Sequence, residues 1–441
     1  MKIALIGNMN NNNFAIMRYF RDLGFDAHLL LYEDDGMFSH EHFRPEADTW
    51  NIEKWIPFIT RMSITNSLTP ALRFPWSWIT SAPSTLRRIF RPGSKTTRPI
   101  SVAYIKRTLS QYNHLVGSGN VPALCEKAGL ILDIFVPYST GVEYVGYPPY
   151  LRVIESSNYL KRHLMLEMRR QQIRGIAKAR HVLNADVGVT EEVLQGIGIE
   201  TLRLPMPMVY ANEDYATVRP GGVLRDAQER IEASRLSILH HARIMWVNSD
   251  RHTLEDWRVL SKNTNWLLES FARLVDARPA MKPLLIMIEY GADVEHTKRL
   301  AKDLGIERSI LWLPKMTRRE LMWILSRVTI GCGEFYETRR TIWGGTGWET
   351  LGSGKPLLQA FNFDEGEFER LFGYPPPPML PASTQEEILQ RLMFVADHPA
   401  AAEDIGRGAK VWFNQYNGVG LAKKWLDLLA RSADTEMVSQ E

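Results

Sequence analysis

Short apolar runs alternate with helix-length segments along most of this 441-residue chain. Residues 2–7 and 27–32 have the composition of buried parallel strands, and a helical pattern over residues 14–23 lies between them and ends at Gly24. A second series of the same kind begins at residues 236–241. Strands that alternate with helices predict parallel sheets covered by helices on both faces, which is a doubly wound α/β fold.

The length of the chain fits two domains of ordinary size. Its apolar content of 45% and charged content of 23% are typical of globular proteins. We predict an N-terminal domain over residues 1–210, a linker over 211–232 and a C-terminal domain over 233–411. A C-terminal helix and tail, residues 412–441, are expected to pack back toward the N-terminal domain.

The compartment is predicted from what the sequence lacks. No run of about 18 uncharged apolar residues is present, so we expect no membrane-spanning helix. The first residues, MKIALIGN, have too short an apolar core for a signal peptide. The two cysteines, Cys125 and Cys332, are too few for a disulfide framework or a zinc cluster. We therefore expect a cytoplasmic protein, with the inner face of the membrane as a peripheral location.

One basic stretch stands out against the net charge of +3. No Asp or Glu occurs between Glu53 and Glu126, and residues 54–110 interleave Lys and Arg with Trp and Phe. The basic residues are Lys54, Arg61, Arg73, Arg87, Arg88, Arg91, Lys95, Arg98, Lys106 and Arg107. We interpret this stretch as an insertion that meets an anionic membrane surface, where aromatic rings lie among the headgroups. Nucleic acid, which we do not expect, and a basic loop packed on its own domain are the alternatives.

Residues 341–358 carry the most specific local pattern, TIWGGTGWETLGSGKPLL. Their glycine-rich turn, residues 344–347, permits backbone angles closed to other residues, so its N–H groups are expected to converge on an anion. A helix opening over residues 346–351 would add its dipole and its free N–H groups. Glu349 is then expected in the first turn, where it can accept hydrogen bonds from a hydroxylated ligand. Plain strand-to-helix connections are also often rich in glycine.

The turns of the N-terminal half give weaker predictions. Residues 7–13 lack the spaced glycines of a dinucleotide fingerprint, so we do not expect a nicotinamide cofactor. We also predict no other cofactor and no metal. Asn11 and Asn12 either cap the following helix, which we favour, or face a polar acceptor. Ser139 and Thr140 follow a predicted strand over residues 130–136 and are further acceptor-side candidates.

The second half of the chain resembles the retaining glycosyltransferases of GT-B architecture, of the glycosyltransferase family four type. Arg243 follows a predicted strand, and Lys262 precedes the helix NWLLESFARLV. The strand ILWLP and the block ETLGSGKPLL, residues 349–358, follow in the order of that family. The resemblance covers about residues 236–430 and, more loosely, the first half. It implies a GT-B fold, two Rossmann-like doubly wound domains that face a shared cleft.

The resemblance also implies roles for individual residues. Arg243 and Lys262 match the pair that holds the donor diphosphate, and two fixed cations can neutralise a diphosphate without a metal. Glu349 matches the last acid of the family's paired-glutamate motif, which implies a contact with the ribose. The loop that meets the sugar and the phosphate corresponds to Gly345, Thr346 and Gly347.

The chain departs from the family at the first glutamate of that motif. The matching position is Thr341, and Glu337 is the candidate that could reach the donor sugar in its place. No general base is identified, as is usual for retaining enzymes of this class, in which the donor phosphate is thought to assist the attacking hydroxyl.

These observations predict a metal-independent, retaining glycosyltransferase that uses a nucleotide-sugar donor. The expected acceptor is a hydroxyl of a lipid-linked or cell-envelope glycan, which would place the protein in cell-envelope polysaccharide biosynthesis. Two alternatives stay open. The same fold serves sugar-nucleotide epimerases and phosphorylases, and the altered glutamate spacing is also compatible with a non-catalytic, membrane-associated scaffold.

Overall fold

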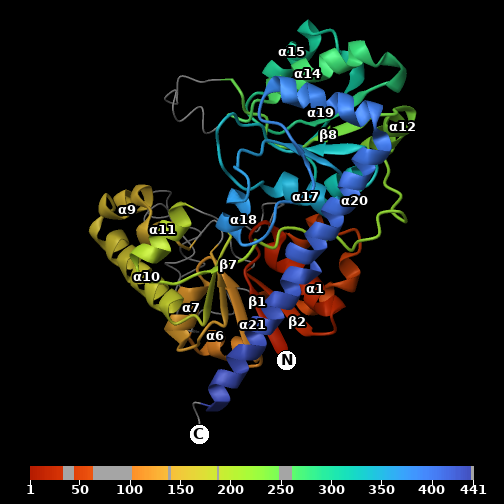
Figure 1. The fold of residues 1–441 in the computed structure, drawn as a ribbon. Coiled ribbons are helices and arrows are strands. Elements are labelled where there is room, and N and C mark those ends of the chain that lie inside the picture. The colour runs from red at the N-terminus through yellow and green to blue at the C-terminus, as the bar shows by residue number, and fades with distance from the viewer. Residues whose placement is uncertain (33–43, 63–101, 138–140, 186–187, 248–260, 439–441) are drawn as a thin grey trace, which may run out of the picture. The chain divides into compact units, whose positions relative to one another are not determined.

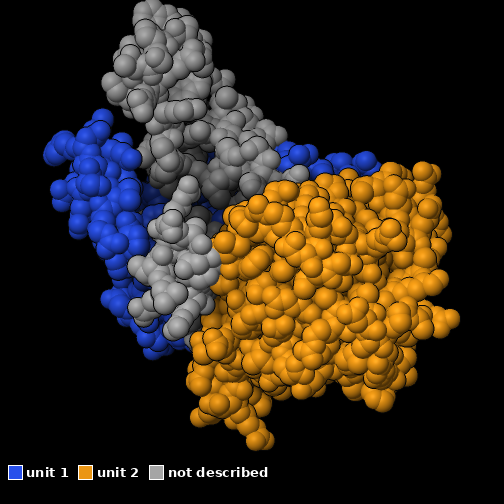
Figure 2. Space-filling model, turned by 90° about the horizontal axis from the view of Figure 1, so that it is seen from above, with its two compact units in different colours: residues 1–46, 51–207, 419–441 blue, residues 47–50, 208–418 orange. Residues whose placement is uncertain are grey.

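A computed structural model describes residues 1–32, 44–62, 102–137, 141–185, 188–247 and 261–438. The chain divides into two compact units, which Figure 2 colours separately. Unit 1 contains residues 1–46, 51–207 and 419–441, and unit 2 contains residues 47–50 and 208–418. Each unit is a parallel sheet with helices packed on it (Figure 1). Among the described residues, no helix is long and apolar enough to cross a membrane.

Unit 1 is built on a seven-stranded parallel sheet. Its strands are β1 (Lys2–Ile6), β2 (Asp26–Tyr32), β3 (Ile59–Met62), β4 (His114–Ser118), β5 (Ile134–Val136), β6 (His181–Asn184) and β7 (Leu202–Arg203). They are ordered β3-β2-β1-β4-β5-β6-β7, so the direction in which the sheet grows reverses between β1 and β4. The runs of Ile, Leu and Ala in β1 and β2 are buried because helices cover both faces of such a sheet.

The helices of unit 1 pack on this sheet and on one another. They are α1 (Asn12–Asp22), α6 (Val102–Leu109), α7 (Val121–Ala128), α8 (Glu143–Gly146), α9 (Pro148–Glu155), α10 (Tyr159–Ala177), α11 (Val189–Gly196) and α21 (Val419–Val438). The contact between α10 and α7 requires a glycine, because a Cβ atom on Gly175 would lie 2.1 Å from the carbonyl oxygen of Pro122. The C-terminal helix α21 packs against α1 within this unit.

Unit 2 is built on a six-stranded parallel sheet. Its strands are β8 (Ser237–His240), β9 (Leu284–Ile288), β10 (Ile310–Leu313), β11 (Ile330–Cys332), β12 (Leu357–Gln359) and β13 (Leu380–Pro381). Its helices are α12 (Val223–Ala233), α14 (Thr264–Ala277), α15 (Val294–Asp303), α16 (Arg318–Leu325), α17 (Gly345–Ser353), α18 (Glu367–Phe372), α19 (Gln385–Asp397) and α20 (Pro399–Tyr416). The order β10-β9-β8-β11-β12-β13 reverses between β8 and β11.

The structure confirms the predicted fold class, since both sheets are parallel and doubly wound. It also differs from the sequence-based description in detail. Parts of the proposed insertion form β3 and α6, and α12 lies in the segment described as a linker. The helical pattern at the C-terminus is divided between α20 and α21, because the chain leaves helical geometry at Asn417. Residues 63–101 of the proposed insertion lie outside the described residues.

Candidate functional site

The candidate site of unit 2 lies where β8 and β11 end. These neighbouring strands flank the reversal of the strand order, and doubly wound sheets bind ligands outside the carboxyl ends of such strands. His241 and Arg243 follow β8, and Glu334 follows β11. Lys262, which precedes α14, is paired with Glu334. The topology therefore brings together Lys262 and Glu334, which are 72 positions apart in the sequence.

Arg243 is an exposed residue between the buried Ala242 and Ile244, in a loop that hydrogen bonds fix to the connection after β9. The N–H of Ile244 donates to the carbonyl oxygen of Tyr290 at 2.7 Å. The carboxylate of Asp293 accepts a hydrogen bond from the N–H of Trp246, also at 2.7 Å. The guanidinium of Arg243 donates to the hydroxyl of Tyr290 at 3.2 Å and lies 5.4 Å from the centre of its ring. The guanidinium of Arg243 is therefore held in one orientation and remains accessible to a ligand.

Lys262 is the more buried cation of the predicted pair. Its side chain is 17% exposed, and its backbone N–H donates to the carbonyl oxygen of Met245 in the Arg243 loop. Burial, together with the positive charges of Arg243 and Arg339, lowers the pKa of Lys262 to about 8. The shift indicates that three cations act on one region of the molecule. Glu334 is the carboxylate that pairs with Lys262 there.

The start of α17 differs from the sequence prediction in its backbone. Gly344, Gly345 and Gly347 all have negative φ, so the expectation of left-handed angles in this turn is wrong. Gly347 is required for space instead, since a Cβ atom there would lie 2.4 Å from the Cβ of Trp343. Within the described parts of the chain, the N–H groups of Gly345 and Thr346 have no hydrogen-bond partner. The helix N-terminus can therefore still donate to an anion.

Glu349 is buried in the second turn of α17, not in the first as predicted, because the helix already begins at Gly345. Its Oε1 accepts a hydrogen bond from Nε of Arg318 at 2.8 Å, and its Oε2 lies 3.0 Å from Nε2 of His241. Burial alone would raise the pKa of Glu349, but the hydrogen bond from His241 and the charge of Arg318 lower it to about 2. The carboxylate is thus ionised and fixed on both sides.

Arg318 extends this network to a short segment from the beginning of the chain. Its NH1 donates to Oδ1 of Asp48 at 3.0 Å, and both side chains are buried. Asp48 belongs to residues 47–50, which are part of unit 2 although their neighbours in the sequence belong to unit 1. Trp50 of this segment donates from its indole N–H to the carbonyl oxygen of Arg319. We call the series Asp48, Arg318, Glu349 and His241 the buried charge network.

Sequence reasoning missed three members of this network. His241 had a local signal, since it ends the strand predicted over residues 236–241 and lies two positions before Arg243. Arg318 had a weaker one, as the first residue of a predicted helix. No local signal identified Asp48, which lies 270 positions from its partner. Glu337, predicted as a contact of the donor sugar, is exposed, and Glu334 rather than Glu337 pairs with Lys262.

The predicted acceptor-side residues belong to unit 1. Asn11 and Asn12 are buried at the end of β1. Asn11 has a left-handed backbone and makes no cap with its side chain; Oδ1 of Asn8 accepts the hydrogen bond from the N–H of Phe14 instead. Asn11 bonds to the Asn8 amide and to the carbonyl oxygen of Arg44. Ser139 and Thr140 lie outside the described residues, so their role stays a prediction.

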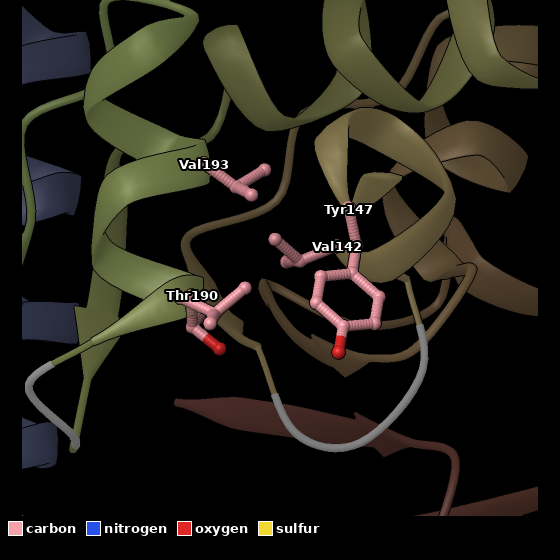
Figure 3. Close-up of a pocket in the computed structure, with 5 residues that line it drawn as sticks. Val142, Tyr147, Thr190 and Val193 are labelled. Carbon is pink, nitrogen blue, oxygen red and sulfur yellow. The ribbon is translucent and has the colours of Figure 1, made fainter. Parts of the chain in front are cut away.

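Unit 1 also contains an open, mainly apolar pocket of about 200 Å³. Val142 and Tyr147 line one side, and Val189, Thr190 and Val193 from α11 line the other. Figure 3 shows the Tyr147 ring with its hydroxyl on the same side as that of Thr190. The walls are thus largely aliphatic, with two hydroxyl groups. The sequence had not indicated this pocket.

No protein-family model matches the chain. No curated protein matches it either. Solved structures do. A crystal structure of Anabaena HepE in complex with UDP is 12% identical, covers 98% of this chain and 100% of that one, and has a TM-score of 0.54. The sucrose-phosphate synthase from Thermosynechococcus elongatus is 13% identical, with coverages of 99% and 100% and a TM-score of 0.53. The N-terminal domain of Candida albicans trehalose-6-phosphate phosphatase is 12% identical, with coverages of 98% and 96% and a TM-score of 0.51.

At these identities the likeness concerns the fold. HepE and sucrose-phosphate synthase are similar over their whole length, and the two Rossmann-like sheets agree with that similarity. The chain therefore has the fold of the GT-B glycosyltransferases, as the sequence predicted. HepE has also been solved in complex with UDP-glucose, at 13% identity to this chain and a TM-score of 0.53.

Proposed function

We propose that this chain is a glycosyltransferase that transfers a sugar from a nucleoside diphosphate donor to a hydroxyl acceptor, without a metal and with retention of the anomeric configuration. Unit 2 binds the donor. The proposed enzyme is of the glycosyltransferase family four type, which the sequence resembles. A fold shared with glycosyltransferases supports it, but the residues of the site carry the chemical argument.

The observation that carries the proposal is the convergence of positive charge at the β8 and β11 strand ends. Arg243 and Lys262 lie on elements fixed to each other by the bond from Lys262 N–H to Met245. Burial is the first cause that lowers the pKa of Lys262, and the charges of Arg243 and Arg339 lower it further. Glu334 supplies one negative charge to Lys262, so further negative charge would stabilise this group of cations. A diphosphate supplies that charge, and arginine binds it bidentately.

The same groups would act in the reaction. As the bond between the sugar and the diphosphate breaks, negative charge grows on the departing phosphate oxygen. Arg243, Lys262 and the N–H groups of Gly345 and Thr346 are suited to stabilise that charge, because they are already oriented before the reaction. No side chain is assigned as a general base, and we propose that a donor phosphate oxygen assists the attacking hydroxyl. Retention then follows, since the acceptor attacks from the side that the diphosphate leaves.

Glu349 is proposed to bind the ribose. It is ionised, and each of its oxygens has lone pairs left after its bonds to Arg318 and His241. Gly345 lies next to it, since a Cβ atom on Gly345 would be 4.0 Å from Oε1 of Glu349. Ribose hydroxyls and a phosphate bound at the start of α17 would thus have neighbouring partners.

The donor base and the acceptor are proposed on weaker support. HepE binds UDP and UDP-glucose, so uridine is the first base to test. For the acceptor we propose a lipid-linked or cell-envelope glycan, with the protein at the cytoplasmic face of the membrane. The basic composition of residues 54–110 supports this assignment.

The decisive experiment combines binding with turnover. Titration calorimetry with UDP and GDP reports the base, and release of nucleoside diphosphate from a panel of sugar nucleotides reports activity. Arg243→Ala and Lys262→Ala are expected to weaken diphosphate binding tenfold or more, the order expected for a charge-assisted hydrogen bond. Arg299→Ala and Lys302→Ala are the matched controls, because both residues are exposed on α15.

The results of these two measurements distinguish an active donor site from a scaffold that only binds a nucleotide. Loss of binding in the site variants with unchanged controls supports the donor site. If a nucleotide binds but no donor is turned over, even when an acceptor is present, the result favours a scaffold that only binds the nucleotide. Absence of binding to both nucleotides contradicts the proposal. With a productive acceptor, nuclear magnetic resonance of the first product formed decides between retention and inversion.

A further inference from the structure

One surface of unit 1 exposes large apolar side chains. Tyr150 and Val153 lie three positions apart on α9, so they share a face, and they are 47% and 49% exposed. At the start of α10, Tyr159 is 88% exposed and Leu160 is 66% exposed. Leu164 follows Leu160 by one helical turn and is also exposed. Single exposed apolar residues are common, whereas a set on two packed helices marks an interaction surface.

Positive charges accompany these apolar residues. Arg152 on α9 and Lys161 and Arg162 on α10 are exposed, and none has an ion pair in the described parts of the chain. Glu155 is the one acid between residues 147 and 166. Other cations further along α10, such as Arg174, are paired with Glu126 and Glu167 instead. Cations without an ion pair therefore accompany the exposed apolar residues of α9 and of the start of α10.

The pocket of Figure 3 lies at the edge of this surface. Tyr147, which lines the pocket, has its ring centre 6.1 Å from that of Tyr150. Val189 lines the pocket as well and is 50% exposed. The α8 helix packs against both α9 and α11, so it connects the apolar face of α9 with the start of α11. An apolar hollow that joins an exposed apolar face can receive an alkyl chain.

We propose that α9, the first two turns of α10 and the start of α11 form a surface that binds a bilayer containing anionic lipids. Aromatic and aliphatic side chains enter the interface, where Tyr is favoured, while the neighbouring Arg and Lys contact headgroup phosphates. A second copy of the chain fits less well, because a two-fold contact would bring the same cations together. Nucleic acid offers no partner for Leu160 and Leu164.

The proposed surface extends the proposed function and rests on it, because a membrane-binding surface would bring the protein to a lipid-linked acceptor. It also differs from the basic stretch of residues 54–110, since its helices lie within residues 148–196. Vesicle binding can be measured without turnover, so failure of this inference and failure of the proposed function are distinguishable.

The test is co-sedimentation of the full chain with vesicles of phosphatidylcholine, with and without phosphatidylglycerol. We expect binding to the anionic vesicles that weakens as salt increases. The double variant Tyr159→Ser, Leu160→Ser should lower the partition coefficient about tenfold or more, because two exposed apolar side chains no longer enter the interface. Val411→Ser is the matched control: it is 66% exposed, like Leu160, but lies on α20 of unit 2.

A second variant, Arg152→Gln, Lys161→Gln, Arg162→Gln, should reduce binding to anionic vesicles and flatten its salt dependence. Far-UV circular dichroism and the thermal unfolding midpoint serve as the check on folding and should be unchanged in both variants. The proposal is overturned if the wild-type chain does not bind anionic vesicles, or if the variants bind them as the wild type does. It is also overturned if sedimentation velocity shows that the apolar variant dissociates an oligomer while vesicle binding persists.

Discussion

Arg318 holds Glu349 in the ionised state from the first position of a neighbouring helix. Its Nε donates to Oε1 of Glu349 at 2.8 Å, and its NH1 donates to Asp48 at 3.0 Å. All three side chains are nearly inaccessible to solvent. One arginine therefore neutralises part of the charge of two buried carboxylates, and the orientation of the proposed ribose contact depends on it.

Replacing Arg318 with Met should destabilise the chain strongly. The change leaves Asp48 and Glu349 without their shared cation, and breaking a buried ion pair in this way costs about 3–5 kcal/mol. Urea unfolding measures the free energy. Arg340→Met is the control, since Arg340 pairs with Asp364 and Glu367 at an exposed position and its loss should cost about 1 kcal/mol or less. Equal effects of the two substitutions would contradict the role given to Arg318.

Glu349 should make the free energy of unfolding depend on pH in the acid range. Its pKa is lowered to about 2 from an ordinary value of 4.5, so its contribution is present above pH 4.5 and is lost as the pH falls toward 2. The shift corresponds to a contribution on the order of 3 kcal/mol. Glu349→Gln should remove that part of the acid dependence. Unfolding free energies of both proteins at pH 7 and near pH 3 test this, and the two should differ less at the lower pH. A constant difference across this range would exclude the ionised carboxylate.

Lys262 should make nucleotide binding depend on pH in the alkaline range. With a pKa of about 8 in the free protein, Lys262 loses its charge as the pH rises above that value. A bound diphosphate favours the charged form, so binding takes up a proton and the affinity for UDP falls by up to tenfold per pH unit above 8. Calorimetry in buffers of different ionisation enthalpy measures the uptake. Lys262→Arg should bind with no such dependence, because arginine stays charged. If the UDP affinity of the wild type and of Lys262→Arg falls equally at alkaline pH, a group other than Lys262 causes the fall.

Strands and helices of unit 2 could be predicted from sequence because their apolar patterns are local. The strand predicted over residues 236–241 contains β8, Ser237–His240, and the predicted strand ILWLP contains β10, Ile310–Leu313. β3 was missed, since Ile59–Met62 has two polar residues, Thr60 and Arg61, between its apolar ends and lies within a stretch that was interpreted by its charge. The burial of a whole strand in a parallel sheet leaves a clear run of Leu and Ile, whereas a short edge strand leaves none.

The site was less predictable than the fold for a physical reason. Arg243 and Lys262 each occupy a position set by the end of one element, and the resemblance to a family supplied their roles. The state of Glu349, in contrast, depends on His241, Arg318 and Asp48, which come from three other parts of the chain. No local pattern encodes such a network, because its members share neither a helix turn nor a strand face.

Asp48 offers the sharpest test of the buried charge network. Asp48→Asn removes its charge but keeps its size, so Arg318 loses one of its two carboxylates and holds Glu349 less firmly. We expect a several-fold loss of UDP affinity, on the order of 1 kcal/mol, because the ribose contact is no longer fixed in advance.

The control for this variant is Glu213→Gln. Glu213 accepts hydrogen bonds from the hydroxyl of Thr49 and the N–H of Trp50, so the substitution weakens the attachment of residues 47–50 and leaves the pair of Asp48 and Arg318 intact. If the affinity falls in Asp48→Asn alone, the charge of Asp48 acts through Arg318. An equal fall in both variants would mean that the segment contributes through its packing, and Asp48→Glu, which restores the charge, would then fail to recover binding.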